Sequence, residues 1–391
     1  MQPPILHIGP TPFFANRGCH IRILNEVKAL QAAGRRVIIC TYGLGGDVDG
    51  VEIRRIWSIP GYTKTDAGFS MFKPLADILL FFLVLQTAWR ERVKIIHGHL
   101  HEGGLIGWCV KMVLFWRRIV LITDIQGSLS GELRSYGMFN KLPFMLSVFY
   151  VLERIICMMP DKIVCSSKAS RDFLVNHCKV AREKIELVGD VVPDTFFAEL
   201  NSRELRKRQG LPIDKLIVIY TGSLLAGKGV DLLIDALEQV LSADDRARFV
   251  LVGYPKDRTE EAVAAAGSSD KVTLPGEVAY TDLADWLGCA DLAVDPKTAG
   301  SGEASGKILH YMAAGLPVVC YDTENNRRFL QADAFYAEAM TADALARAIG
   351  LALANEATRR KYGVSCRSRA QIRFSSGSVA ALLHNTYQRF E

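Results

Sequence analysis

A glycine-rich stretch in the second half of the chain has the residue types that bind phosphate groups. In "YTGSLLAGKGVDLLIDAL", which begins at Tyr220, Gly222 and Gly227-Lys228 stand one position short of the P-loop pattern G-x-x-x-x-G-K-[ST]. Gly229 replaces the hydroxyl residue that would hold magnesium. Glycines let the backbone approach a ligand, and the following helix offers free N–H groups. The stretch therefore predicts a phosphate or diphosphate site with Lys228 adding charge, and a plain strand-to-helix turn is the alternative.

A second polar group lies in "IIHGHLHEGG". His97, His99 and His101 occupy alternate positions, and Glu102 follows directly. Alternate residues of an extended chain share a face, so three imidazoles could converge there. Three histidines and a carboxylate suit zinc. The same pattern also suits side chains that bind a substrate, or histidines that are hydrogen-bonded at a sheet edge.

Alternating strands and helices must position these residues. In the first half we expect strands at 4–8, 36–42, 51–57, 94–99, 118–123 and 161–166, with helices such as 21–34 and 76–92 between them. The alternation restarts after a polar stretch near residue 200, with strands at 215–221, 248–254, 271–276, 291–296 and 317–322. This order predicts an α/β chain of two Rossmann-like domains, with ligands beyond the carboxyl ends of the strands, in a cleft between the domains.

Composition narrows the class of protein. The chain has 391 residues, 49% of them hydrophobic and 23% charged, with a net charge of +5. This charge is too weak to indicate nucleic acid, but it is compatible with an anionic ligand or an anionic membrane surface. The nine cysteines form no C-x-x-C pair, and the N-terminus has no signal-peptide pattern. We expect a cytoplasmic protein.

Two motifs of the second half resemble family 4 glycosyltransferases, which have the two-domain GT-B fold. "TGSLLAGKGVDLLIDAL" is similar to the G-R-L-x-x-x-K-G loop of that family. "GSGEASGKILHYMAAGLPVVCYD" is similar to its E-x7-E-A-M-A-x-G-x-P-V-V signature. The resemblance implies an acceptor domain over residues 1–195 and a nucleotide-sugar domain over 196–373. A final helix over 374–391 is expected to cross back to the first domain.

The resemblance also implies an activity and a set of site residues. The enzyme would be a retaining transferase that moves a sugar from a nucleotide diphosphate-sugar to an acceptor hydroxyl, without a catalytic metal or other cofactor. The expected donor-binding residues are Arg17, Gly18, Gly222, Ser223, Lys228, Gly253, Lys307, Ile308 and His310. The expected acceptor-binding residues are His99, His101, Glu102 and Asp124. Gln126, Glu303 and Lys228 are the expected catalytic residues.

This sequence departs from the family at four places. Ser223 replaces the loop Arg, so Lys228 carries the side-chain charge of that loop. His310 replaces the Glu that holds the nucleotide ribose, and a neutral imidazole can still bond a hydroxyl. Glu303 lies one residue beyond the position of the family's first Glu, and it either replaces that Glu or is solvated.

Gln126 stands where the family often has a His beside the transferred sugar. An amide can bond a sugar hydroxyl but cannot act as a base. In retaining enzymes of this type the donor phosphate takes the acceptor proton, so a Gln is acceptable. The alternative is a structural turn around Gly127.

Two other activities compete with transfer. A nucleotide-sugar epimerase of the same fold would need general bases in the cleft, and Gln126 weighs against it. A P-loop nucleotide-binding protein is opposed by Gly229.

The acceptor is suggested by apolar content in the first half. Residues 78–85, 109–122 and 144–159 are apolar stretches, flanked or interrupted by Arg90, Arg92, Lys111, Arg117 and Arg118. Neither the first nor the last is a good membrane span, since the first is too short and the last is interrupted by charges. Such helices either pack on a face of the parallel sheet, as part of the core, or lie on the surface of a bilayer. We expect a lipid-linked or cell-envelope glycan acceptor and peripheral contact with the inner face of the cytoplasmic membrane. The sequence does not fix the oligomeric state.

Overall fold

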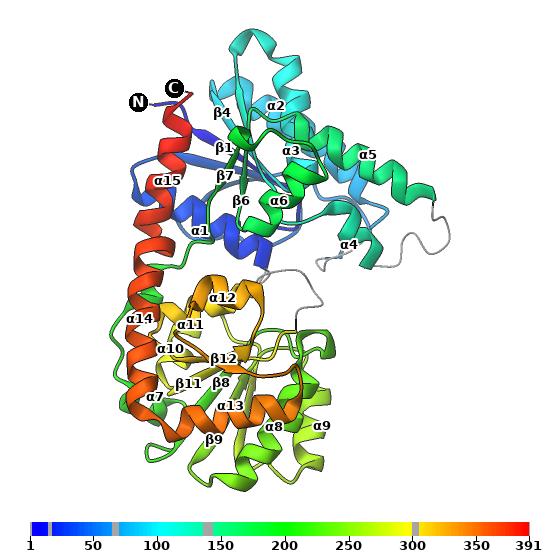
Figure 1. Cartoon of the computed structure of the whole chain (residues 1–391). Helices are drawn as coiled ribbons and strands as arrows, with labels where there is room; N and C mark the ends of the chain where they lie inside the picture. The colour runs from blue at the N-terminus through cyan, green and yellow to red at the C-terminus, as the bar shows by residue number, and fades with distance from the viewer. Residues whose placement is uncertain (1, 15–17, 65–69, 136–143, 299–304, 391) are drawn as a thin grey trace. The chain divides into compact units, whose positions relative to one another are not determined.

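The computed structural model describes residues 2–14, 18–64, 70–135, 144–298 and 305–390. The chain forms two compact units (Figure 1). The first comprises residues 1–191 and 376–391, and the second comprises residues 192–375. The sequence had placed the corresponding boundaries after residues 195 and 373.

The first unit is built on a parallel sheet with the strand order β3-β2-β1-β4-β5-β6-β7. Its strands are β1 (Ile5–Gly9), β2 (Val37–Thr41), β3 (Glu52–Arg55), β4 (Ile95–His99), β5 (Val120–Asp124), β6 (Lys162–Cys165) and β7 (Ile185–Leu187). β1, β2 and β4 are buried at every residue because helices cover both faces of the sheet.

Alternate strand residues face two different helix layers. Ile5 and Ile95 pack with α1 (Gly18–Ala32) and α15 (Ser376–Gln388). Leu6 and Ile96 pack on the opposite face with α2 (Lys73–Arg90) and α3 (Leu100–Val113). The unit also contains α4 (Leu129–Ser135), α5 (Phe144–Met158), α6 (Lys168–Asn176) and short 3-10 turns, among them η1 (Phe115–Arg117).

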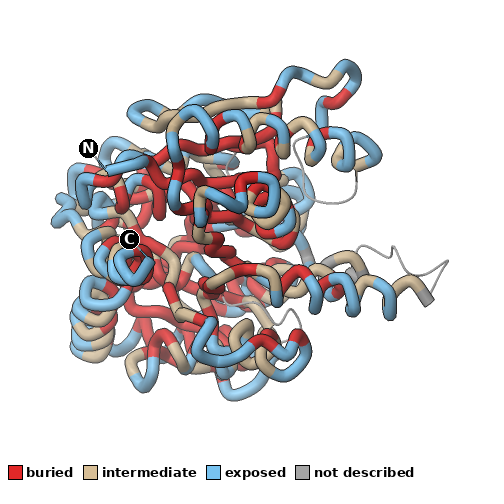
Figure 2. Tube along the Cα trace, turned by 90° about the horizontal axis from the view of Figure 1, so that it is seen from above, coloured by how far each residue is buried: buried red, intermediate tan, exposed pale blue. Residues whose placement is uncertain are grey.

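The second unit has a parallel sheet with the order β10-β9-β8-β11-β12-β13. Its strands are β8 (Leu216–Thr221), β9 (Ala247–Val252), β10 (Val272–Gly276), β11 (Leu292–Asp295), β12 (Val318–Tyr321) and β13 (Phe335–Ala337). The helices α8 (Val230–Ala243) and α13 (Ala342–Ala354) pack on one face of the sheet, while α10 (Leu283–Gly288), α11 (Lys307–Ala313) and α14 (Glu356–Phe374) pack on the other. The turn η4 (Ala226–Lys228) and the helices α7 (Ser202–Arg208), α9 (Asp257–Ala265) and α12 (Glu324–Leu330) complete the unit. Figure 2 shows the buried residues in the interior of the molecule and the exposed residues on its outer segments.

The expected fold of two Rossmann-like domains with parallel sheets is confirmed, and every expected strand is present. β7 and β13 were not expected. Each has three residues and lies at an edge of its sheet, so neither carries an apolar run long enough to be recognised. In the described part of the chain, no helix has the length and apolar character that crossing a bilayer requires.

Candidate active site

In the second unit, three loops meet at the edge of the sheet where its strands end, which we call the second carboxyl edge. Gly229, at the start of α8, has a φ of 81°, and a Cβ there would collide with the carbonyl oxygen of Pro296 after β11. Gly253, after β9, lies so close to Gly222 that a Cβ would strike the carbonyl oxygen of Gly222. Only glycine permits these approaches. Gly253 therefore acts by letting the Gly222 loop pack closely.

Lys307 brings a positive charge to this loop. It begins α11, and its Nζ lies 4.0 Å from the centre of the Tyr220 ring and 3.6 Å from Oδ1 of Asp295. The same Nζ lies 3.2 Å from the point that a Cβ on Gly222 would occupy. Asp295 is fully buried, and among the described residues neither of its oxygens has a hydrogen-bond partner. Lys307 and Gly222 are thus neighbours, as a shared anion site requires.

Lys228 supplies a second ammonium group near the start of α8. It ends η4, and its backbone N–H donates to the carbonyl of Leu225 at 2.9 Å. Within the part of the chain that the structure describes, no ion pair or hydrogen bond holds its side chain. Ser223, in the same loop, accepts a bond from the Tyr220 hydroxyl through its carbonyl at 2.8 Å. The Tyr220 ring thereby braces the loop beneath Lys307.

His310 and Ile308 lie further along α11. The His310 ring is half-buried, with Nε2 2.8 Å from the Tyr280 hydroxyl and the Phe196 ring centred 4.5 Å away. The side chain of Ile308 is buried in the core, and its N–H donates to the Ser305 carbonyl. A donor contact from the Ile308 side chain is therefore not supported, because that side chain faces the sheet.

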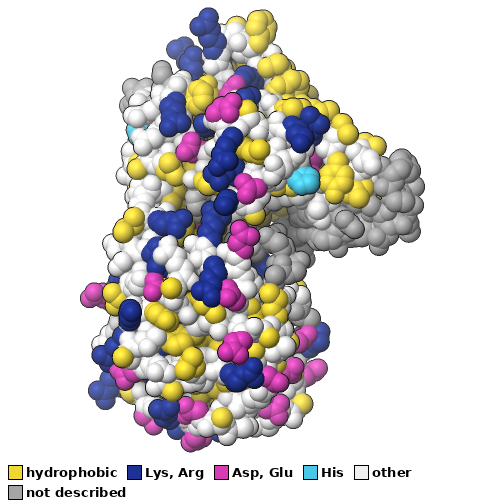
Figure 3. Space-filling view, viewed as in Figure 1, with side chains coloured by type: hydrophobic (Ala, Val, Ile, Leu, Met, Phe, Trp, Pro, Cys, Tyr) yellow, Lys and Arg dark blue, Asp and Glu magenta, His cyan; other side chains and the backbone are white. Residues whose placement is uncertain are grey.

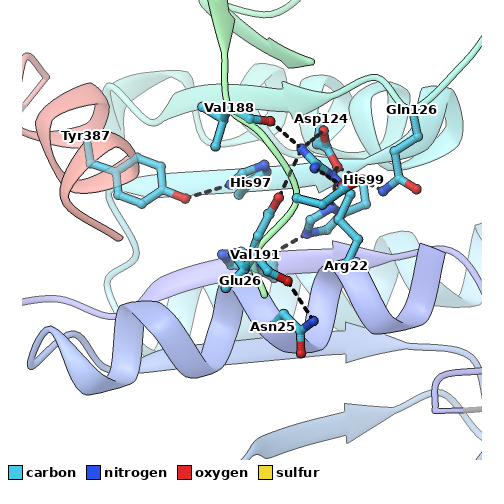
Figure 4. Close-up of polar contacts among 12 residues, drawn as sticks. Arg22, Asn25, Glu26, His97, His99, Asp124, Gln126, Val188, Val191 and Tyr387 are labelled. Carbon is cyan, nitrogen blue, oxygen red and sulfur yellow. Dashed lines mark hydrogen bonds and ion pairs between the residues drawn. The ribbon is translucent and has the colours of Figure 1, made fainter. Parts of the chain in front are cut away.

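The first unit holds a buried ionic cluster at its own carboxyl edge (Figure 4). Asp124, the last residue of β5, accepts two hydrogen bonds from the Arg22 guanidinium, at 2.8 and 2.9 Å. Arg22 also donates to Asp190 and to the carbonyl of Val188. Burial alone would raise the pKa of Asp124, but Arg22 and the hydrogen bond from His99 hold it well below its usual range. Asp124 is therefore a carboxylate.

Gln126 and His99 complete the contacts of Asp124. Gln126 donates from Nε2 to Oδ2 of Asp124 at 2.8 Å, so its carbonyl oxygen is left to accept a bond from a ligand. Nδ1 of His99 lies 3.3 Å from the same oxygen, and Nε2 of His99 lies 2.9 Å from Nδ1 of His7. Neither His99 nor Asp124 is left available as a general base.

The three alternate histidines do not converge. β4 ends at His99, and α3 begins at Leu100, so His101 and Glu102 lie on a helix instead of a strand. His101 lies 3.4 Å from Glu153 on α5, while Glu102 accepts a bond from Lys73 at 2.6 Å. His97 turns toward α15, where its Nδ1 lies 2.7 Å from the Tyr387 hydroxyl. The two remaining histidines on the sheet are joined by His7 from β1.

The remaining expected residues lie at the start of α1 or outside the described part of the chain. Gly18 begins α1 and is exposed. Arg17 and Glu303 lie outside the described residues. Sequence reasoning missed Arg22 and Glu26, which are buried on α1 and directed at the cluster. Their i, i+4 spacing is that of an ordinary ion pair on a helix surface, so the only signal was that each directly precedes an apolar residue, Ile23 or Val27.

Two family models match the chain. Residues 17–190 match a glycosyl transferase 4-like domain, and residues 215–355 match glycosyl transferases group 1. The chain is 26% identical to alpha-D-kanosaminyltransferase from Streptomyces kanamyceticus over 72% of this chain and 73% of that protein. It is 28% identical to D-inositol 3-phosphate glycosyltransferase from Xylanimonas cellulosilytica over 95% of this chain and 91% of that protein.

Solved structures share the fold. Sucrose-phosphate synthase from Thermosynechococcus elongatus aligns with a TM-score of 0.79 at 20% identity, covering 99% of each chain. Anabaena HepE in complex with UDP-glucose aligns with a TM-score of 0.74 at 17% identity, also covering 99% of each chain.

Proposed function

The chain belongs to the group 1 glycosyltransferases, with a glycosyltransferase 4-like first half, and from this we propose that it is a retaining enzyme that uses a nucleotide diphosphate-sugar. It transfers the sugar to an acceptor hydroxyl. The observation that carries the proposal is the pair of ammonium groups, Lys228 and Lys307, beside the glycine loop of the second carboxyl edge. HepE, which has the same fold, binds UDP-glucose.

Lys228 and Lys307 act on the leaving group. When the bond between the anomeric carbon and the phosphate oxygen breaks, negative charge develops on the diphosphate. Charges that are already positioned where this charge develops lower the barrier most. Both ammonium groups meet this need, and the N–H groups at the start of α8 add to them. The proposal includes no catalytic metal or other cofactor.

On the side of the transferred sugar, Gln126 and Asp124 position the sugar, and neither accepts a proton from the acceptor hydroxyl. The bond from the acceptor oxygen to the anomeric carbon forms on the face that the diphosphate leaves, and the departing phosphate oxygen takes the acceptor proton. This route retains configuration and asks no protein group to accept a proton. Asp124 is ion-paired, and both ring nitrogens of His99 are hydrogen-bonded, so both residues fit such a reaction. An epimerase would require a free base, which neither of these residues provides.

The proposal is tested by incubating the enzyme with UDP-, GDP- and ADP-sugars without acceptor. Slow release of nucleoside diphosphate supports transfer, whereas isomerisation of the donor indicates an epimerase. Release of phosphate from ATP with magnesium indicates a nucleotide hydrolase. A product whose anomeric configuration is inverted relative to the donor contradicts the retaining route.

We further propose that the acceptor is lipid-linked and presented at an anionic membrane surface. α3 packs between α2 and α5, and these three helices leave apolar side chains exposed (Figure 3). α2 exposes Leu75, Ile78, Phe82 and Trp89, and α5 exposes Val148, Val151, Leu152 and Ile155. The spacing in each set places the side chains on one helix face.

Aromatic and basic residues continue this surface. Phe115 is 71% exposed and Trp116 is 55% exposed on η1, and the Arg117 guanidinium lies 4.9 Å from the centre of the Trp89 ring. Arg90 and Arg118 are exposed nearby in the chain. Lys111 is instead paired with Asp161 at 2.6 Å, so it does not contribute. Apolar helix faces edged by Arg suit the interface of an anionic bilayer.

Flotation with liposomes tests this surface. The protein should bind anionic vesicles, and the binding should weaken as salt rises. A double substitution, Phe115→Ser with Trp116→Ser, should abolish it. Val364→Ser with Ile372→Ser is the matched control, since Val364 and Ile372 are exposed apolar residues of α14 in the second unit. Equal absence from anionic and neutral vesicles would contradict membrane docking and leave a water-soluble acceptor.

A further inference from the structure

A second set of buried polar groups lies beside the ionic cluster of the first unit, and the proposed transfer does not use it. Glu26 on α1 and His97 and His99 on β4 place one potential metal-ligand atom each within 4.8 Å of the others. The exposed fraction of each of these three residues is 0%. The set differs from the His97, His99, His101 and Glu102 group that the sequence suggested, because His101 and Glu102 lie on α3.

Three atoms of this set have no hydrogen-bond partner among the described residues. They are Nε2 of His97 and both carboxylate oxygens of Glu26. That carboxylate forms an ion pair of 3.1 Å with Arg22, whose guanidinium is already held by Asp124. A buried polar group without a hydrogen bond is costly, so three such atoms in one place indicate a ligand.

The outer contacts fix His99 in the tautomer that binds a metal through Nε2 and allow His97 to adopt the same form. A carboxylate can only accept, so Nδ1 of His99 carries the proton that faces Asp124. Its Nε2 then accepts a hydrogen bond from Nδ1 of His7 at 2.9 Å, and a metal ion would take the place of that proton. Nδ1 of His97 is bonded to the Tyr387 hydroxyl, which leaves its Nε2 for a ligand. Metal-binding histidines usually have such a partner on the other ring nitrogen.

The charges also favour a divalent cation. The Arg22 guanidinium faces the carboxylates of Asp124, Glu26 and Asp190. Burial raises the pKa of Glu26, so its carboxylate is charged only with a cation beside it, and the four groups then carry two negative charges. An ion of charge +2 would balance them, and imidazole with carboxylate is a ligand set that Zn²⁺ accepts.

We propose that Glu26, His97 and His99 bind a structural divalent metal ion of the Zn²⁺ type. His7, whose Nδ1 lies 2.9 Å from Nε2 of His99, is the candidate fourth ligand. The ion joins α1 to β4 and, through His97 and Tyr387, to α15. It has no part in the transfer step, so the test of the site is independent of the test of the activity.

The test uses the full chain, stripped with a chelator and then given ZnCl₂. At a free zinc concentration of 100 times the dissociation constant, the melting temperature should rise by roughly 5–10 °C. Glu26→Gln keeps the shape of the side chain but removes the charge, and it should lose most of this rise. His177→Ala is the matched control, because His177 is an exposed histidine at the end of α6, and it should keep the full rise.

Cobalt distinguishes this site from the nine cysteines. Stripped wild-type protein with one equivalent of Co²⁺ should show the visible bands of a nitrogen and oxygen ligand set without the thiolate charge-transfer band. A thiolate band would place the ion at cysteines and overturn the proposal. Failure of the unmodified chain to take up cobalt or zinc, including after refolding with the metal, would overturn it as well.

Discussion

The carboxyl edges of the two sheets hold their charges in opposite ways. In the first unit Asp124 and Arg22 are buried and paired with each other, and Gln126 and His99 add hydrogen bonds to the same carboxylate. In the second unit, the ion pair between Lys307 and Asp295 is long, at 3.6 Å, and glycines leave space beside the backbone around Lys307. One edge is a closed network that fixes geometry, and the other has positive charge available for a ligand. Substitutions should therefore affect stability at the first edge and turnover at the second.

Replacement of Arg22 should have the largest effect, and it should act on stability. Arg22→Met leaves Asp124 buried without its partner, which typically costs about 3–5 kcal/mol. Chemical denaturation measures the loss. Asp190→Asn is the matched control, because Asp190 contacts the same guanidinium but is 38% exposed, and it should cost under about 1 kcal/mol. Similar losses in both variants would mean that the buried pair is not what fixes this edge.

At the second edge, Lys228→Ala and Lys307→Ala should each lower kcat by about 100- to 1000-fold, the cost of removing one positioned group that stabilises developing charge. Steady-state kinetics with the donor identified in the screen measures this. Lys271→Ala is the control, since Lys271 precedes β10, at the amino end of the same sheet, and pairs with the exposed Asp245. Full turnover in both active-site variants would remove the anion site from this edge.

Gln126 should affect both stability and turnover, because it donates a hydrogen bond to Asp124 and is proposed to contact the sugar. Gln126→Ala should lower kcat/KM about tenfold, the loss of a single hydrogen bond of about 1.4 kcal/mol. The unfolding free energy should change much less than in Arg22→Met, because Gln126 is only partly buried. Unchanged kcat/KM together with lower stability would make Gln126 part of a structural turn.

His310 should give the smallest effect. If it bonds the nucleotide ribose, His310→Ala should raise the donor KM by about three- to tenfold with little change in kcat, the signature of lost ground-state binding. His310→Glu should be tolerated. Tyr280→Phe removes the hydrogen bond to His310 but keeps the imidazole, so its KM should stay near the wild-type value. A donor KM that does not move in His310→Ala would make the residue a packing partner of Phe196.

Local patterns predicted the strands well because most expected strands are apolar, β-branched runs, and the one at 51–57 still has Val, Ile and Ile among its charged residues. They also located the glycine loop and Lys307, since a strand, glycines and a helix start are adjacent in sequence. β7 and β13 escaped because an edge strand of three residues needs neither a long run nor burial on both faces.

The closed network of the first edge could not be predicted in the same way. Arg22 and Asp124 are 102 residues apart, and no short motif joins them. Glu153 is one of the charges that interrupt the apolar stretch at 144–159 and argue against a membrane span. The structure buries it, and it accepts bonds from the backbone N–H groups of Leu129 and Ser130 and from the Ser130 hydroxyl. The partners of such side chains are distant in sequence, so their structural role can be recognised only once the fold is known.

The return of α15 to the first unit affects the order in which the protein can be made. Tyr387 and Leu383 fill the core beside α1, and the Tyr387 hydroxyl bonds His97. A ribosome synthesises α15 after every residue of the second unit, so the second unit can fold while the first still lacks part of the helix layer on one face of its sheet. Until then, the apolar face of α1 that α15 covers is open to water and to other nascent chains. Translation of the last helix therefore sets the time at which the first unit becomes complete.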